Sequence, residues 1–97
     1  MTDETLEWFE DPAGISGVRG KDFFVHSGFN FAVYREGERT IQFKVQRGFR
    51  NGKHLMVIPQ DAFAYWDHSA TNNKNEDQER MRANFIAAIQ FAGVTVE

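Results

Sequence analysis

The sequence predicts an α+β fold: an antiparallel β-meander of four to five strands with one long C-terminal α-helix packed across one face. Two patterns support this prediction. Alternating apolar residues separated by glycine-bearing turns fill the middle of the chain, and a single helical apolar stripe follows near its end. The length of 97 residues corresponds to one domain, 1–97, and ten Phe supply apolar surface for a core although the chain has no Cys.

The first segment is short and acidic. Its large apolar residues are Leu6, Trp8 and Phe9, and the turn signal Asp11-Pro12-Ala13-Gly14 follows them. An edge strand and a single helical turn fit this pattern equally well, so both stay open.

Strand patterns begin at Val18 and continue through the apolar run 23–25. Phe29, Phe31 and Val33 then alternate with Asn30, Ala32 and Tyr34. The polar, glycine-bearing segment 35–38 is typical of a hairpin loop.

The clearest strand pattern follows this loop. Ile41, Phe43 and Val45 alternate with polar residues, which predicts one dry and one wet face. Asn51-Gly52 predicts a two-residue hairpin turn that joins this strand to a strand at 54–58, where Pro59 ends the pairing.

A helix is expected after a turn with Asp61 as cap and a polar loop at 69–75. Asn75 is the predicted N-cap, Gly93 the predicted C′ residue, and Val94 is placed to close a Schellman motif. The apolar stripe consists of Met81, Phe85, Ala88, Ile89 and Ala92. The helix should cover the Ile41, Phe43 and Val45 face, and 95–96 should return to the sheet as a short strand.

Charge is unevenly distributed along the chain, whose net charge is −3. Residues 1–17 carry five acids and no base, residues 18–53 carry eight bases against three acids, and residues 54–97 carry six acids against three bases. No apolar run reaches the ~20 residues of a membrane span, and the N-terminus lacks the pattern of a signal peptide. The expected location is the cytoplasm, with no membrane partner.

Catalytic and cofactor signals are weak. His26, His54 and His68 lack metal-ligand spacing, and no glycine-framed serine nucleophile is present. The Gly-Lys pairs at 20–21 and 52–53 lack the Ser or Thr of a phosphate loop. We therefore expect no enzyme activity, no catalytic residue, no cofactor and no metal.

Basic residues concentrate on the predicted hairpins, interleaved with Tyr34 and Phe49. They are Arg35, Arg39, Lys44, Arg47, Arg50 and Lys53. Such a surface can bind single-stranded nucleic acid, so a nucleic-acid-binding sheet at Arg35–Lys53 is the alternative function. The acidic terminal segments oppose it, so nucleic acid is not the leading partner.

One resemblance concerns residues 30–97. The order is the turn Tyr34-Arg35-Glu36-Gly37-Glu38-Arg39, then Thr40-Ile41-Gln42-Phe43, then Trp66-Asp67, then a helix that ends Ile86-x-Ala-Ile-x-Phe-x-Gly-Val-Thr-Val-Glu. This order resembles the immunity protein 74 family, small bacterial proteins of contact-dependent and polymorphic toxin systems. The resemblance implies a non-catalytic antidote that binds a cognate toxin domain in the cytoplasm.

The resemblance identifies no contact motif, so two partner-binding surfaces stay open. One is an acidic surface that imitates a nucleic-acid substrate at a basic toxin cleft; it comprises Asp3, Glu4, Glu7, Glu10 and Asp11. The other is an aromatic and basic anchor made by Phe49 and Arg50. Trp66 should be buried, Asp67 should hold the loop, and a homodimer stays open as a further assembly.

Overall fold

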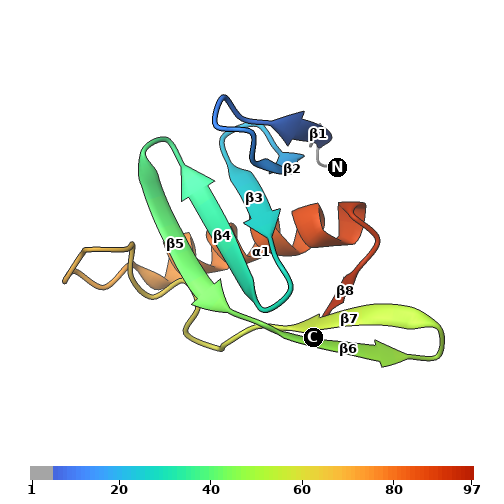
Figure 1. Cartoon of the computed structure of the whole chain (residues 1–97). Coiled ribbons are helices and arrows are strands. Elements are labelled where there is room, and N and C mark those ends of the chain that lie inside the picture. The colour runs from blue at the N-terminus through green and yellow to red at the C-terminus, as the bar shows by residue number, and fades with distance from the viewer. Residues whose placement is uncertain (1–5) are drawn as a thin grey trace.

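The computed structural model describes residues 6–97. Within this range, eight strands form two sheets beside one helix, α1 (Asn75–Phe91) (Figure 1). The first sheet contains β1 (Glu7–Glu10), β2 (Ser16–Arg19), β3 (Phe24–Ser27), β4 (Phe31–Glu36) and β5 (Arg39–Lys44) in that order. The second contains β6 (Gln46–Arg50), β7 (Lys53–Val57) and β8 (Thr95–Val96).

The first sheet is the predicted antiparallel meander, with each strand paired to its neighbours in the chain. The segment after Leu6 is an edge strand and not a helical turn, because β1 pairs with β2 from Glu7 to Glu10. β4 and β5 are joined by a two-residue turn at Gly37, whose φ of 62° requires the left-handed region. The predicted α+β fold is therefore confirmed.

The expected single strand from Ile41 to the Asn51-Gly52 turn is wrong, because the chain changes sheets at Val45. The Val45 side chain is buried and its N–H donates to the Asn30 carbonyl (3.0 Å). Since β4 begins at Phe31, the chain beyond Val45 has no further partner in the first sheet and pairs with β7 instead. The apolar alternation of Ile41, Phe43 and Val45 runs up to this change and gives way to Arg47, but the pattern does not show which strand the following residues pair with.

An aromatic cluster links the first sheet to α1. The rings of Tyr34 and Phe63 lie 5.5 Å apart, and those of Phe43 and Phe85 lie 5.3 Å apart, both edge to face. Tyr34, Phe63 and Phe85 are almost completely buried. The predicted packing of the helix on the Phe43 face is confirmed, whereas the buried face of β4 carries Ala32 and Tyr34 and leaves Phe29 exposed.

The helix stripe is buried at Met81, Phe85, Ala88 and Ile89, while Ala92 beyond them is exposed. The C-terminus is the predicted Schellman motif: the Gly93 N–H donates to the Gln90 carbonyl and the Val94 N–H to the Ile89 carbonyl. No helix among residues 6–97 combines the length and apolarity needed to cross a membrane.

The predicted N-cap at Asn75 is off by one residue. Lys74 occupies the N-cap position and makes no side-chain cap hydrogen bond. Gln78 instead ties the helix to the preceding loop, because its side-chain amide donates to the Asn73 carbonyl (2.8 Å) and to Asn72 Oδ1 (3.2 Å). These side-chain hydrogen bonds attach the first turn of the helix to the preceding loop.

Trp66-Asp67 fixes the segment that leads to the helix. Trp66 is buried, and the Asp67 carboxylate accepts hydrogen bonds from the Gln42 N–H (3.3 Å) and Thr40 Oγ1 (3.2 Å). The Asp67 N–H also donates to the Thr40 carbonyl (2.8 Å), so the loop lies along the outer edge of β5. Residues 61–66 form turns and not the expected helical turn.

Candidate functional site

The hairpin formed by β6 and β7, residues 46–57, extends away from the helix-covered sheet (Figure 1). Its turn is the predicted Asn51-Gly52 pair, with φ of 52° and 77°. All five residues of β6 are exposed, whereas β7 contributes Met56 to the core. The hairpin is therefore anchored to the body along β7 and is open to solvent along β6.

The end of the hairpin presents an aromatic and basic surface. Phe49 is 66% exposed, and its ring packs edge to face on His54 with ring centroids 5.2 Å apart. Beside it, Arg50 forms an exposed ion pair with Glu97 (3.1 Å). The predicted exposure of Phe49 beside Arg50 is thus present in the structure, and His54 and Glu97 join them.

Arg47 holds the base of the hairpin. Its guanidinium donates to the Gly28 carbonyl (2.7 Å), to the Phe29 carbonyl (3.3 Å) and to Ser27 Oγ (3.3 Å). These contacts connect β6 to the loop between β3 and β4. The last backbone hydrogen bond between this part of the chain and that loop is made by Val45, just before β6. The Arg47 side chain therefore orients the hairpin relative to the first sheet.

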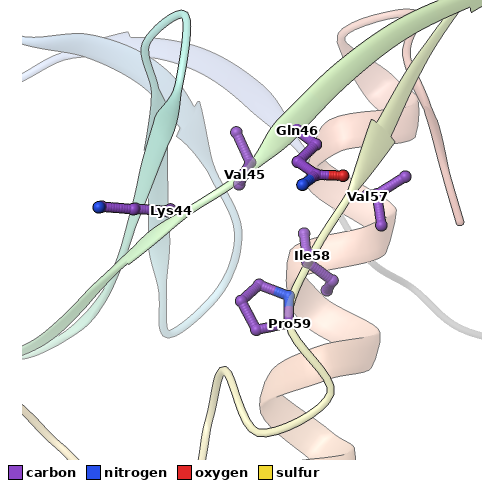
Figure 2. Close-up of a pocket in the computed structure, with 6 residues that line it drawn as sticks. All are labelled: Lys44, Val45, Gln46, Val57, Ile58 and Pro59. Carbon is purple, nitrogen blue, oxygen red and sulfur yellow. The ribbon is translucent and has the colours of Figure 1, made fainter.

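A groove of about 280 Å³ lies at the base of the hairpin, where the two sheets diverge (Figure 2). Figure 2 shows the chain entering β6 on one side and leaving β7 on the other. The lining residues are Lys44, Val45, Gln46, Val57, Ile58 and Pro59. Val57 is 41% exposed, so the groove has an apolar surface with polar groups at its rim. Its size suits one or two side chains of a partner protein.

The predicted acidic surface is described by the structure only at Glu7, Glu10 and Asp11. Glu7 forms an ion pair with Arg19, and Glu10 is exposed on β1 and forms no ion pair with the other residues of 6–97. Asp3 and Glu4 lie outside the described residues. Glu7 and Glu10 lie on β1 in the first sheet, whereas Phe49 and Arg50 lie on the hairpin of the second, so the two predicted surfaces are separate.

Asp11 has a structural role and is not an accessible member of an acidic surface. Its Oδ1 accepts hydrogen bonds from the Ile15 N–H (2.9 Å) and the Ala13 N–H (3.0 Å), and Oδ2 lies 3.6 Å from Arg35. The hydrogen bond from Ile15 is the largest cause that holds the pKa of this carboxyl below its ordinary value. The side chain is 6% exposed, so we correct its assignment as a partner contact.

The basic residues of the alternative nucleic-acid surface are mostly engaged within the protein. Arg35 lies over the Phe24 ring at 4.7 Å and near Asp11, and Arg39 lies over the Trp66 ring at 4.4 Å. Tyr34, one of the two expected stacking aromatics, is buried. A continuous strip of basic and stacking groups is therefore absent from the described part of this face.

A second polar cluster joins α1 to the β4–β5 hairpin. The Tyr34 hydroxyl donates to Glu36 and accepts a hydrogen bond from the Asn84 amide (3.0 Å), and Arg80 pairs with the same Glu36 carboxylate. Burial is the main cause that raises the pKa of Tyr34 strongly, which keeps the hydroxyl neutral. The hydrogen bond to Glu36 raises the pKa of Arg80. This cluster attaches the helix to the sheet.

The three histidines lie apart. His26 Nδ1 contacts the Ser16 carbonyl (2.7 Å), His54 packs on Phe49, and His68 has a positive φ of 66° in the loop. Among residues 6–97, no group of three or more His, Cys, Asp or Glu side chains is arranged to hold a metal ion.

The chain matches no family model, and neither a curated protein nor a solved structure was found to match it. The resemblance to the immunity protein 74 family therefore stays a prediction that rests on the residues quoted above.

Proposed function

We propose that this protein is a non-catalytic cytoplasmic immunity protein that binds and neutralises a cognate toxin domain, and that the hairpin of residues 46–57 is its main contact. The observation that carries this proposal is Phe49, 66% exposed on a hairpin that is attached to the body along β7 and through Arg47 at its base. A large exposed aromatic beside an arginine is typical of the residues that dominate protein interfaces.

The charge of the hairpin supports the same surface. Residues 39–60 contain Arg39, Lys44, Arg47, Arg50 and Lys53 and no acid. A partner with an acidic patch would be attracted to this segment, and opposite potentials speed capture. The acidic alternative is supported less well, because Asp11 is buried and Glu7 is paired with Arg19.

Site-specific crosslinking tests the proposal. A photo-crosslinking phenylalanine analogue would replace Phe49 in one variant and Phe29 in the other, and both would be expressed in the source cell. Phe29 is the matched control, because it is 82% exposed but lies in the loop between β3 and β4. We expect position 49 to crosslink one polypeptide that position 29 does not.

The captured polypeptide must then behave as a toxin. We expect its C-terminal domain to stop growth when expressed alone, and growth to return when this protein is co-expressed. Equal crosslinking from both positions would contradict the assignment to the hairpin. Crosslinks only to nucleic acid would support the alternative function, and a captured polypeptide without toxicity would contradict the immunity role.

A further inference from the structure

Three strands of the described chain have an outer edge without a backbone partner: β1 in the first sheet, and β6 and β8 in the second. The opposite edge of the first sheet is covered, because Asp67 bonds to both Thr40 and Gln42 on β5. Unpaired edges bind other strands readily, and proteins usually block them. The β8 edge is only two residues long, so β1 and β6 offer the longer open edges, and their charges are opposite.

The outward peptide groups of β6 follow from its pairing. The Met56 carbonyl accepts a hydrogen bond from the Glu97 N–H (2.8 Å), so the Met56 peptide groups face β8 and not β6. Arg47 is the register partner of Met56, so Arg47 directs its own N–H and C=O to the outer edge. By the alternation of antiparallel pairs, Phe49 does the same, and it is the partner of His54.

The outward peptide groups of β1 follow in the same way. The Asp11 N–H donates to the Ile15 carbonyl (2.9 Å), so Asp11 faces β2. Alternation then turns Phe9 and Glu7 toward β2, and Trp8 and Glu10 toward the outer edge. Each edge therefore offers two residues, spaced two positions apart, for a further strand.

We propose that β1 of one copy of this chain pairs antiparallel with β6 of a second copy. Backbone bonding requires outward residues to face outward residues, which places Trp8 opposite Phe49 and Glu10 opposite Arg47. The same register places Glu7 opposite Arg50 and Phe9 opposite Gly48. This inference does not depend on the proposed function.

The side chains favour this register. Both glutamates lie opposite arginines, although Glu7 would have to leave Arg19, Arg47 the β3–β4 loop and Arg50 Glu97. Trp8, which is 64% exposed and packs on Phe91, lies opposite the exposed Phe49. A side chain at Gly48 would find no atom closer than Leu55 Cβ at 3.9 Å, so the Phe9 ring has room above it. Phe9 at present lies beside Arg19, whose guanidinium is 4.1 Å from the ring centroid.

Charge also separates this pairing from its competitors. Pairing β6 with β6 would bring together two hairpins that each carry Arg47, Arg50 and Lys53. Pairing β1 with β1 would bring together Glu7 and Glu10 of both copies. Only the mixed pair joins an acidic strand to a basic one.

Because the two edges differ, the contact is head-to-tail and leaves one edge open at each end of a pair. The assemblies should therefore grow with protein concentration, unless the copies close into a ring. The contact covers only four residues of each strand, so we expect it to be weak and to decrease as salt rises.

Sedimentation velocity on the full chain, from about 10 µM to about 1 mM, tests this inference. The average mass of the wild-type protein in solution should rise above the chain mass of 11.2 kDa as its concentration increases. Trp8→Pro and Phe49→Pro each remove an outward N–H without removing a bond of the existing ladder, so each variant should stay monomeric. In an equimolar mixture of the two proline variants, association should stop at a pair with twice the chain mass. Trp8→Pro retains the intact β6 edge and Phe49→Pro retains the intact β1 edge, so only one contact can form.

Circular dichroism checks that both proline variants are folded. If either is not, Glu10→Lys and Arg50→Glu replace them, and each should lower association at least tenfold. Lys44→Glu is the matched control, because Lys44 is basic and exposed but lies outside the proposed register, so its association should equal that of the wild type.

Several results would overturn the inference. A wild type that remains at its chain mass up to about 1 mM would do so, as would a Trp8→Pro variant that associates like the wild type. Growth of the mixture beyond a pair would also contradict the head-to-tail contact. A monomeric wild type whose Phe49→Pro variant loses a bound partner protein would assign the edge to that partner's strand instead.

Discussion

The two sheets of this protein differ in how much of their surface is buried. In the first sheet, β3, β4 and β5 lie under α1, and their inward residues Val25, Tyr34 and Ile41 are buried with Phe63 and Phe85. In the second, β6 is exposed at every position, and Met56 of β7 is the only fully buried residue on its three strands. The first sheet holds the fold together, and the second presents a surface.

The polar contacts repeat this division. The first sheet and α1 share a polar group of Tyr34, Glu36, Arg80 and Asn84, in which Tyr34 is buried and Arg80 is about half exposed. The hairpin is held by Arg47 at its base and by the exposed Arg50–Glu97 pair near its end. The hairpin exposes an aromatic side chain and makes few contacts to the rest of the protein. Its surface is therefore suited to bind a partner, since it is not needed for folding.

The largest expected effect is in the core of the first sheet. Phe85→Ala removes a fully buried ring that contacts Phe43 and Phe63, and we expect it to lower the free energy of unfolding by about 3–5 kcal/mol. Urea denaturation followed by tryptophan fluorescence measures it. A loss below about 1 kcal/mol would mean that the helix does not cover this sheet as described.

A smaller effect is expected at the first turn. Asp11→Asn removes the charge that the Ile15 and Ala13 N–H groups stabilise, and should lower Tm by about 5 °C at neutral pH. The folded-state pKa of Asp11 lies below its unfolded value, so this stability is present above about pH 4 and is lost as pH falls through the folded pKa. Tm measured from pH 7 to pH 2 should therefore converge for the wild type and variant. A constant difference would contradict the electrostatic role.

The hairpin turn should respond more weakly and locally. Gly52→Ala places a Cβ at φ of 77° and should cost about 1 kcal/mol or less. Amide hydrogen exchange should increase at residues 46–57 and stay unchanged at β4 and β5. If amide exchange becomes faster by the same factor in both sheets, the two sheets unfold together and do not differ in local stability.

The smallest stability effect is expected where the binding effect is largest. Phe49→Ala should change the free energy of unfolding by about 0.5 kcal/mol at most, because the ring is 66% exposed. The same variant should lose at least tenfold in affinity for the cognate toxin domain, measured by calorimetry with Phe29→Ala as control. A large loss of stability would place Phe49 in the core and remove the basis of the proposed function.

Self-association and partner binding would use the same hairpin. If β6 pairs with β1 of another copy, a partner that binds at Phe49 has to displace that strand. Assembly and partner capture should therefore compete, and addition of the cognate partner should return the assembled protein to a complex containing one copy of this chain.

Local sequence determined several elements on its own. The Asn51-Gly52 turn and the Gly93-Val94 helix end depend on backbone angles that few residues adopt, so residue type alone predicts them. The helix stripe around Met81 and Phe85 follows from its 3.6-residue period, and Trp66 is buried as its size and apolarity suggest. The neighbours Gly48 and Arg50 and the adjacent turn favour exposure of Phe49, which the structure has.

Only the tertiary structure decided the rest. The change of sheets at Val45 depends on where β4 ends, and the contact of Arg35 with the Asp11 carboxylate joins residues 24 positions apart in the sequence. β8 returns to β7 in parallel and not to the meander, since the Schellman turn directs the chain toward Met56. The outward peptide groups of β1 and β6 likewise follow from pairing register. These features arise from contacts between distant segments, which periodicity and residue type do not encode.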